Sequence, residues 1–384
     1  MADVVQLDHA QGHDQDLTPP TRKLLLILSC ILLALGNCGA PQLMRLYFVH
    51  GGNRLWFTSW LETGGWPFIF IPLTVRYLRN QRSGKNFKRD HPESESHGSR
   101  EAERLKFFTL KLRLFIGSAV IGLLTGLDDY LYAFGVKRLP LSTLSLIIAS
   151  HLAFTAFFAF LLVKQKFTFY SVNAIVLLVV GSAVLGLNTN SDRPLGVSKS
   201  AYFAGFFMTI AAAALYGFVL PAVERMYKKC RQDVTYGLVM EVQLVMCFFA
   251  TLLCTIGMLI NKDFQAIPKE AKEYDLGEMK YYIVVVWSAM LWQCFFLGAI
   301  GVIFCASSLL SGIIIAVLLP FTEILAVIIF KEKFTPEKGV ALVLSLWGFV
   351  SYFYGEIKHT KKLKQEEVVV QRSHGNDWPQ IFIE

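Results

Sequence analysis

The stretches Lys164-Gln-Lys-Phe-Thr168 and Lys331-Glu-Lys-Phe-Thr335 are two copies of one motif, one in each half of the chain. Each copy follows one long apolar run and precedes another. The first half contains five membrane-length apolar runs, the last of which follows the first copy of the motif. The second half contains five more. An odd number of spans in each half forces the second half to enter the membrane from the opposite side. Such an inverted repeat is typical of secondary transporters with a binding site near the bilayer midplane.

The composition fits a membrane protein rather than a soluble domain. The chain is 54% hydrophobic and 17% charged, whereas soluble domains carry about a quarter charged residues. Because about 20 apolar residues cross a hydrocarbon core of about 30 Å, we predict an all-α membrane protein of ten transmembrane helices in two inverted five-helix repeats. The predicted spans are 24–43, 55–75, 114–134, 142–163, 169–187, 201–221, 237–260, 281–303, 308–330 and 338–355.

Polar segments divide the chain and predict its orientation. We expect a disordered cytosolic tail at 1–21, a first repeat at 22–187 with a cytosolic linker at 76–113, a second repeat at 188–355 and a cytosolic tail at 356–384. With a cytosolic N-terminus, inside segments carry 24 of the 37 Lys and Arg, 11 of them in the linker. The positive-inside rule therefore favours two cytosolic termini.

Several activity classes lack their sequence signals. We find no phosphate-binding loop, no nucleophile–base set and no paired cysteines. The net charge of +8 reflects membrane orientation and does not indicate nucleic-acid binding. We therefore expect no enzymatic activity, metal or cofactor, and an energy source that is a gradient or the substrate itself. The oligomeric state cannot be predicted.

The second span contains a carboxyl directly before a helix break. Glu62 is followed by Thr-Gly-Gly-Trp-Pro67, and Pro67 cannot donate a backbone hydrogen bond to the carbonyl of Thr63. Broken helices with freed carbonyls are used in transporter cavities. The alternative is that Glu62 is a packing residue that a neighbouring hydroxyl satisfies.

Two further polar groups lie in the third and fourth spans. Asp128 and Tyr132 are four residues apart and share a helix face, beside a second acid at Asp129. His151 lies mid-span and could bind a polar substrate or relay a proton. The alternatives are an interfacial cap with belt tyrosines for the acids, and a contact with a neighbouring helix for His151.

The second half carries its own polar residues in the spans. Gln243 and Trp292 suit a flat heteroaromatic ligand, because an amide pairs with ring nitrogens and an indole stacks; they could equally hold helices together. Glu241 lies near the cytosolic end, where capping and gating are alternatives. Glu323 follows Pro320 in the ninth span.

These residues stand in longer stretches that closely resemble the plant purine permeases. The resemblance covers about 22–364, and three stretches carry most of it: Leu124-Thr-Gly-Leu-Asp-Asp-Tyr-Leu-Tyr-Ala-Phe-Gly-Val-Lys-Arg-Leu-Pro140, Trp292-Gln-Cys-Phe-Phe-Leu-Gly-Ala-Ile-Gly301 and Trp347-Gly-Phe-Val-Ser-Tyr-Phe-Tyr-Gly-Glu-Ile-Lys358. It implies the drug/metabolite transporter superfamily, with proton-coupled uptake of adenine, other purines and cytokinins. It also implies the plasma membrane, with intracellular membranes used by some members. Family members often have Gln in place of His151 and Asn in place of Asp129, which bears on substrate preference.

We therefore predict a proton-coupled importer of purine-like bases. The expected substrate-binding residues are Asn37, Trp60, Glu62, His151, Tyr216, Gln243 and Trp292. The proton-carrier candidates are Glu62 and Asp128 first, then Glu241 and Glu323. A facilitator or exporter of other flat amines such as alkaloids is the second hypothesis, and a non-transporting membrane receptor or scaffold is the third.

Overall fold

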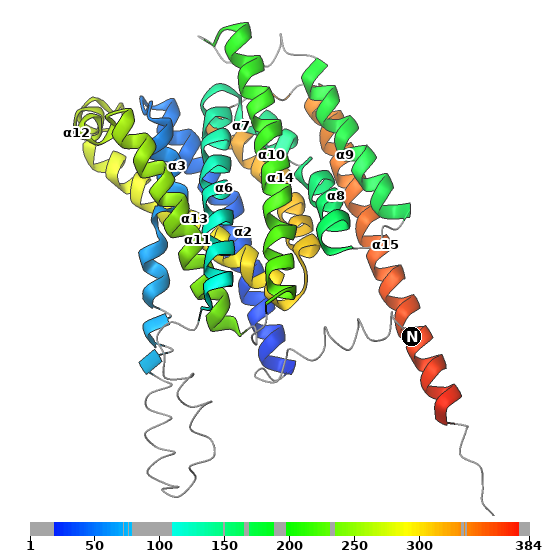
Figure 1. Cartoon of the computed structure of the whole chain (residues 1–384). Coiled ribbons are helices and arrows are strands. Elements are labelled where there is room, and N and C mark those ends of the chain that lie inside the picture. Colours follow the sequence, from blue (N-terminus) through cyan, green and yellow to red (C-terminus); the bar gives the residue numbers. More distant parts are fainter. Residues whose placement is uncertain are drawn as a thin grey trace, which may run out of the picture.

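The computed structural model describes residues 19–71, 73–75, 77–78, 110–148, 150–164, 169–187, 197–230, 235–331, 334 and 336–375. Within these ranges the secondary structure is helical and no strand occurs (Figure 1). The predicted tail at 1–21 and linker at 76–113 lie largely outside them. The all-α prediction is confirmed.

Five described helices are long and apolar enough to cross a membrane: α2 (Pro19–Val49), α6 (Leu112–Arg138), α10 (Lys199–Lys228), α11 (Tyr236–Ile260) and α13 (Glu278–Cys305). The other helices are α3 (Leu55–Gly64), the 3-10 helix η1 (Trp66–Ile69), α7 (Leu141–Ile148), α8 (His151–Val163), α9 (Phe169–Leu187), α12 (Asp263–Glu273), α14 (Ser308–Phe330) and α15 (Pro336–Gly375). α15 continues past position 355, where the last span was predicted to end, into the segment predicted as a tail.

The fourth predicted span, 142–163, is not one continuous helix. It is split into α7 and α8 by a turn at Ser150, whose hydroxyl donates to the carbonyl of Ile147 at 2.7 Å. A serine side chain that bonds the preceding turn competes with the helical backbone bonds. The turn places His151 at the first position of α8, and neither Pro nor Gly marks the break.

The helices pack into one bundle with α9 and α15 side by side at its edge (Figure 1). α2 and α13 pack closely against each other, because glycines stand where they cross. A Cβ added at Gly36 would lie 2.4 Å from the backbone nitrogen of Phe295, and one at Gly298 would lie 2.4 Å from that of Leu33. Small residues permit such close crossings in membrane helices.

The outer surface of the bundle is apolar, as a lipid-facing surface requires. On α2, Leu24, Ile27, Ile31 and Leu35 are each more than half exposed. Their spacing of three or four residues places them on one helix face, while Leu33 and Ala40 are fully buried. The hydrophobic side chains therefore cover both the inside and the outside of the bundle.

α12, in a segment predicted as a loop, covers one end of the bundle. Glu270 on α12 accepts hydrogen bonds from the hydroxyls of Tyr47 and Tyr281, at the ends of α2 and α13. Arg54, directly before α3, contacts Glu270 at 3.6 Å and Asp263 at 3.4 Å. α12 thus ties together α2, α3 and α13 at this end.

Candidate functional site

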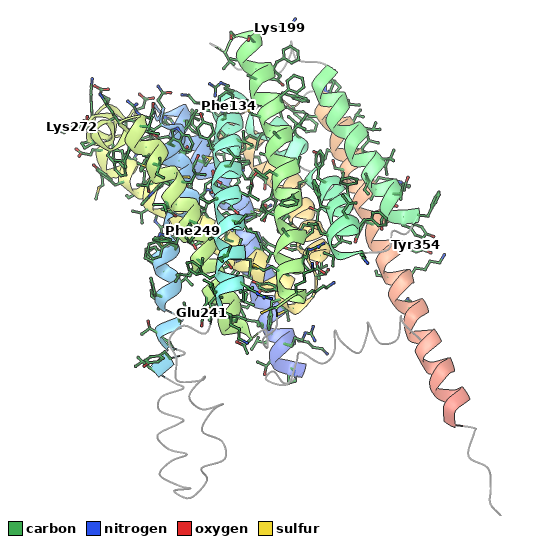
Figure 2. All side chains as sticks on the ribbon, viewed as in Figure 1. Phe134, Lys199, Glu241, Phe249, Lys272 and Tyr354 are labelled. Atoms are coloured by element: carbon green, nitrogen blue, oxygen red, sulfur yellow. The ribbon has the colours of Figure 1, made fainter. Side chains whose placement is uncertain are left out.

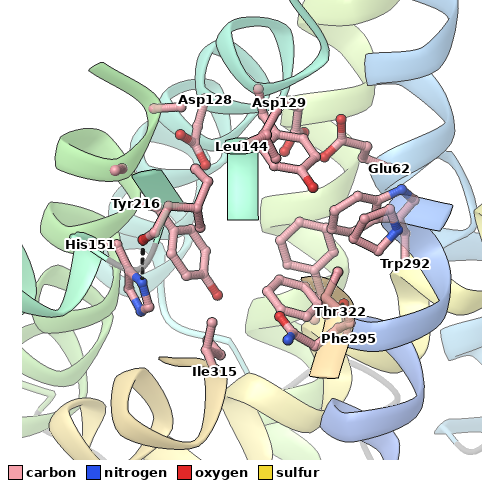
Figure 3. A pocket seen from close by; sticks show the side chains of 17 residues that line it. Glu62, Asp128, Asp129, Leu144, His151, Tyr216, Trp292, Phe295, Ile315 and Thr322 are labelled. Carbon is pink, nitrogen blue, oxygen red and sulfur yellow. Dashed lines mark hydrogen bonds between the residues drawn. The ribbon is translucent and has the colours of Figure 1, made fainter. Parts of the chain in front are cut away.

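A cavity lies inside the bundle, and the empty space in it, including the part open to solvent, is about 650 Å³. Figure 3 shows its lining side chains, which come from α2, α3, α6, α7, α8, α10, α13 and α14. They are Asn37, Pro41, Glu62, Asp128, Asp129, Tyr132, Leu144, Ile148, His151, Ala212, Ala213, Tyr216, Trp292, Phe295, Phe296, Ile315 and Thr322.

Three carboxyl groups meet at one end of this cavity (Figure 3). Glu62 comes from α3, and Asp128 and Asp129 come from α6; each side chain is at least nine-tenths buried. No arginine or lysine is among the lining residues. Buried acids without a cationic partner are costly in a membrane and indicate a functional role.

The helix break after Glu62 has its own hydrogen-bond partner. Pro67 has no backbone N–H and cannot donate to the carbonyl of Thr63. The backbone N–H of Gly65 donates to this carbonyl instead, and so does Gln293 Nε2 on α13, at 3.1 Å. Thr251 on α11 donates its hydroxyl hydrogen to Thr63 Oγ1 at 3.1 Å. Two neighbouring helices therefore fix the end of α3, and with it the position of Glu62.

Aromatic rings form one wall of the cavity. Trp292 stands edge-on to Tyr132 and to Phe295, with ring centroids 5.7 and 5.5 Å away. Tyr216 lies 6.0 Å from Phe295 with the ring planes 34° apart. The indole nitrogen of Trp292 has no hydrogen-bond partner. This wall can stack on a flat ring and donate one hydrogen bond to it.

His151 lines another side of the cavity and is fully buried. Its Nδ1 lies 2.9 Å from the carbonyl oxygen of Ile148, drawn as the dashed line in Figure 3. A carbonyl only accepts, so Nδ1 carries the hydrogen, and Nε2 of the neutral ring is an acceptor. Nε2 has no hydrogen-bond partner.

Asn37 adds an amide to the cavity. Its backbone carbonyl accepts from Thr322 Oγ1 at 3.3 Å, while its Nδ2 is buried without a hydrogen-bond partner. A side-chain amide can pair with two adjacent atoms on the edge of a purine ring. The lining residues as a set can therefore stack a flat base, hydrogen-bond its edges and hold protons.

Comparison with known proteins gives the family. A family model described as purine nucleobase transmembrane transport matches residues 24–362. Purine permease 3 of Arabidopsis thaliana is 52% identical over 90% of this chain and 95% of its own length. Purine permease 2 of the same plant is 49% identical over 93% of this chain and 99% of its own length. The chain is a member of the purine permease family. Its relatives are named as permeases, which are transporters and not enzymes.

Five of the substrate-binding residues predicted for this purine permease line the cavity: Asn37, Glu62, His151, Tyr216 and Trp292. Trp60 does not, and its indole nitrogen donates to Thr255 on α11 at 3.1 Å. Gln243 is buried behind the lining residues, and its Nε2 donates to Cys247 Sγ at 3.0 Å.

Of the predicted proton carriers, Glu62 and Asp128 line the cavity of this permease. Glu241 is buried in α11 but lies near the end of the bundle opposite Lys272 (Figure 2), outside the cavity. The side chain of Glu323 lies outside the described part of the chain.

The prediction did not include several lining residues of this permease. Asp129 was noted beside Asp128 and, through the resemblance, as a position that bears on substrate preference, but it was not among the expected binding or proton-carrying residues. Tyr132 was predicted only to share the face of Asp128. Phe295 and Phe296 were assigned no role in the site, although a sequence signal existed. Their positions are offset from Asp128 and Asp129 by the same amount that separates the two Lys-x-Lys-Phe-Thr copies.

Proposed function

We propose that this purine permease is a secondary active transporter that imports purine nucleobases and their derivatives, including adenine and cytokinins, with protons. The observation that carries this proposal is the cavity, in which buried acids without a cationic partner face aromatic rings. The rings and the amide of Asn37 suit a purine, and an acid without a cationic partner can take up and release a proton. No ATP-binding motif offers another energy source.

We also propose the ten-helix architecture of two inverted five-helix repeats, 22–187 and 188–355. Sequence supports it beyond the first motif. Residues 147–168 and 314–335 share Ile-Ile-Ala, Phe-Thr and Lys-x-Lys-Phe-Thr at the same offset. Pro-x-x-x-Arg-x-Tyr occurs at 41–47 in α2 and at 221–227 in α10.

Backbone conformation supports the same pairing of α8 with α14. Lys164 ends α8 with φ 57° and ψ 35°, and Lys331 ends α14 with φ 50° and ψ 39°. Left-handed conformations are uncommon for residues other than glycine, so their occurrence at equivalent positions of both motif copies favours a repeated structural unit.

Helix packing supports the repeat as well. If α2, α3, α6, α8 and α9 correspond to α10, α11, α13, α14 and α15, the contacts of one half recur in the other. α2 packs on α13 and α10 packs on α6; α2 packs on α14 and α10 packs on α8. Each of three further contacts joins a helix to its own counterpart in the other half: α3 packs on α11, α8 on α14 and α9 on α15. This is the pattern of a two-fold axis through the bundle.

The cavity lies where these two halves meet. Ile148 and Ile315 both line it, as do Asp128 and Phe295, and each pair has the offset of the repeated Lys-x-Lys-Phe-Thr motif. Binding at the interface of two repeats is the common arrangement in secondary transporters. The two halves contribute different chemistry, since acids in the first half face aromatic rings from the second.

The charge distribution supports cytosolic termini, and the resemblance to the purine permeases implies the plasma membrane, across which purine would enter from the outside together with protons. The decisive experiment is uptake of labelled adenine and trans-zeatin into proteoliposomes, with and without an inward proton gradient. We expect accumulation only with the gradient. Uptake that ignores the gradient would contradict proton coupling, and no uptake of either compound would contradict purine transport.

One observation favours a second candidate. Three acids beside aromatic rings would also accept a flat amine that carries a positive charge, so facilitated transport or export of alkaloids is the alternative. It predicts that the substrate moves without an inward proton gradient. The same proteoliposomes tested with nicotine, a basic amine that is not a purine, separate the two functions.

A further inference from the structure

The three acids of the cavity are not equivalent. The carboxyl groups of Glu62 and Asp129 lie within hydrogen-bonding distance of each other, across the contact between α3 and α6. No hydrogen bond joins Asp128 to either of them. One oxygen of each acid, Oε1 of Glu62, Oδ1 of Asp128 and Oδ2 of Asp129, is buried without a hydrogen-bond donor. Figure 3 shows all three at the same end of the cavity.

Two carboxyl groups can form a hydrogen bond only if one of them carries a proton, because an ionised carboxylate has no hydrogen to donate. Two ionised carboxylates this close together would also repel each other strongly in a buried site. The geometry of Glu62 and Asp129 therefore matches a pair with one shared proton.

The groups around this pair offer no other compensation. Asp128 and Tyr132 face it from α6, Tyr216 from α10, and Cys247 and Cys254 from α11. The side chains that α2 and α13 contribute here are uncharged: Asn37, Trp292 and Gln293. No lysine or arginine of the described residues acts on either carboxyl.

We propose that Glu62 and Asp129 share the transported proton between α3 and α6, and that Asp128 is left to accept a hydrogen bond from an amino or ring N–H group of the purine. This inference rests on the proposed function and assigns separate roles to acids that the sequence could not distinguish. Binding a proton joins the carboxyl groups of two helices, and releasing it leaves two negative charges facing each other across the same contact. The arrangement of α3 relative to α6 that is favoured when the proton is bound therefore differs from the one that is favoured when it is released.

Hydrogen bonds at the end of α3 connect the shared-proton site to two other helices. Thr63, the residue after Glu62, is held by Gln293 of α13 and Thr251 of α11. A change in the distance between Glu62 and α6 is therefore passed to α11 and α13, which correspond to α3 and α6 in the proposed second repeat.

Three single variants test the division of roles: Asp129→Asn, Glu62→Gln and Asp128→Asn. An amide at 129 or 62 keeps a hydrogen-bond partner for the remaining carboxyl but cannot hold the shared proton. We expect Asp129→Asn and Glu62→Gln to lose accumulation of labelled adenine driven by a proton gradient, while still exchanging adenine across the membrane. We expect Asp128→Asn to retain gradient-driven accumulation and to bind adenine at least tenfold more weakly. Glu278→Gln, exposed at the start of α13, is the matched control.

Infrared spectroscopy of the purified protein provides a readout that does not depend on transport. The unmodified protein and Asp128→Asn should share one carbonyl-stretch band of a protonated carboxyl at neutral pH, and Asp129→Asn and Glu62→Gln should each lose that band. Persistence of that band in both latter variants, or normal accumulation by Asp129→Asn, would overturn the shared proton. If the unmodified protein neither binds nor accumulates adenine, the proposed function fails, while the infrared test still decides whether the pair holds a proton.

Discussion

Trp292 offers the sharpest test of how single residues bind substrate. Its ring lines the cavity between Tyr132 and Phe295, and an aromatic platform under a base contributes roughly 1–3 kcal/mol. Trp292→Ala should weaken purine binding by that amount, and Trp292→Phe should recover most of it, because stacking needs a flat face. Saturation binding of labelled adenine to the purified variants measures both.

The control for this prediction is Trp287→Ala. Trp287 is on the same helix, and 53% of its surface is exposed on the outside of the bundle, so its removal should leave adenine affinity unchanged. Equal affinity for the unmodified protein and Trp292→Ala would place the stacking platform elsewhere in the cavity, with Tyr216 the next ring to test.

His151→Gln should change the order in which substrates are preferred. The bond from Nδ1 to Ile148 holds the imidazole so that Nε2 is an acceptor, whereas a glutamine amide brings both a donor and an acceptor. Competition by adenine, isopentenyladenine, zeatin and caffeine against labelled adenine measures the ranking. An unchanged ranking would assign His151 to helix packing rather than to the substrate.

For the residues that line the candidate cavity, the sequence prediction agrees with the structure where polarity alone decides and differs from it where helix rotation decides. Glu62 and His151 stand out as polar groups in apolar spans, and both line the cavity. Trp60 precedes Glu62 by two residues, about 200° around a helix, so the two cannot face the same cavity. Gln243 is equally polar, but its amide donates to Cys247 one turn further along the same helix, on a face of α11 that meets Gln293 of α13. The rotation of each helix is set by contacts with its neighbours, which a single sequence does not specify.

At the scale of the element, the break in α3 yields a double-variant prediction. Gln293→Ala removes the side-chain donor to the Thr63 carbonyl and leaves it with the backbone N–H of Gly65 alone. The loss of one such hydrogen bond costs about 0.5–1.5 kcal/mol. The additional variant Pro67→Ala restores a backbone N–H to the position that can bond Thr63. Thermal unfolding in detergent should show a lower Tm for Gln293→Ala and a smaller loss when Gln293→Ala is made in the Pro67→Ala background.

Cys294→Ala, half-buried on the same helix, is the control and should change Tm little. Additive effects of Gln293→Ala and Pro67→Ala would contradict the hydrogen bond as the link between them, since independent sites add.

The end of a helix could be predicted where a residue that disfavours helical backbone, such as proline or glycine, marks it. The Gly-Gly-Trp-Pro sequence predicts the end of α3, and the structure ends α3 at Gly64. The turn between α7 and α8 has no such marker, because it depends on the hydroxyl of Ser150 bonding the previous turn. α12 was also missed, since its charged sequence is held in place by contacts of Glu270 and Asp263 with distant helices rather than by apolar periodicity.

At the scale of the whole molecule, the proposed repeat requires the two motif copies to face opposite sides of the membrane. The structure places Lys164 and Lys331, the first residues of the two copies, at opposite ends of the bundle. Arg225 donates to the carbonyl of Leu162 near the end of α8, and its neighbour Glu224 accepts from Ser308 at the start of α14. The end of α8 and the start of α14 are therefore at one level, and α14 then runs 23 residues to the other side, about 34 Å.

Lys164→Cys and Lys331→Cys should accordingly react with a membrane-impermeant maleimide from opposite sides of a cell. Both lysines are exposed, and the labelling is made in a background in which the seven native cysteines are replaced. With cytosolic termini, four spans precede Lys164 and nine precede Lys331, so we expect labelling of intact cells at 331 only and labelling at 164 after the membrane is opened. Labelling of both positions from the same side would mean an even number of spans between the copies. An even number would leave the two halves parallel, and the two-fold relation through the cavity would then have to be abandoned even if purine transport were demonstrated.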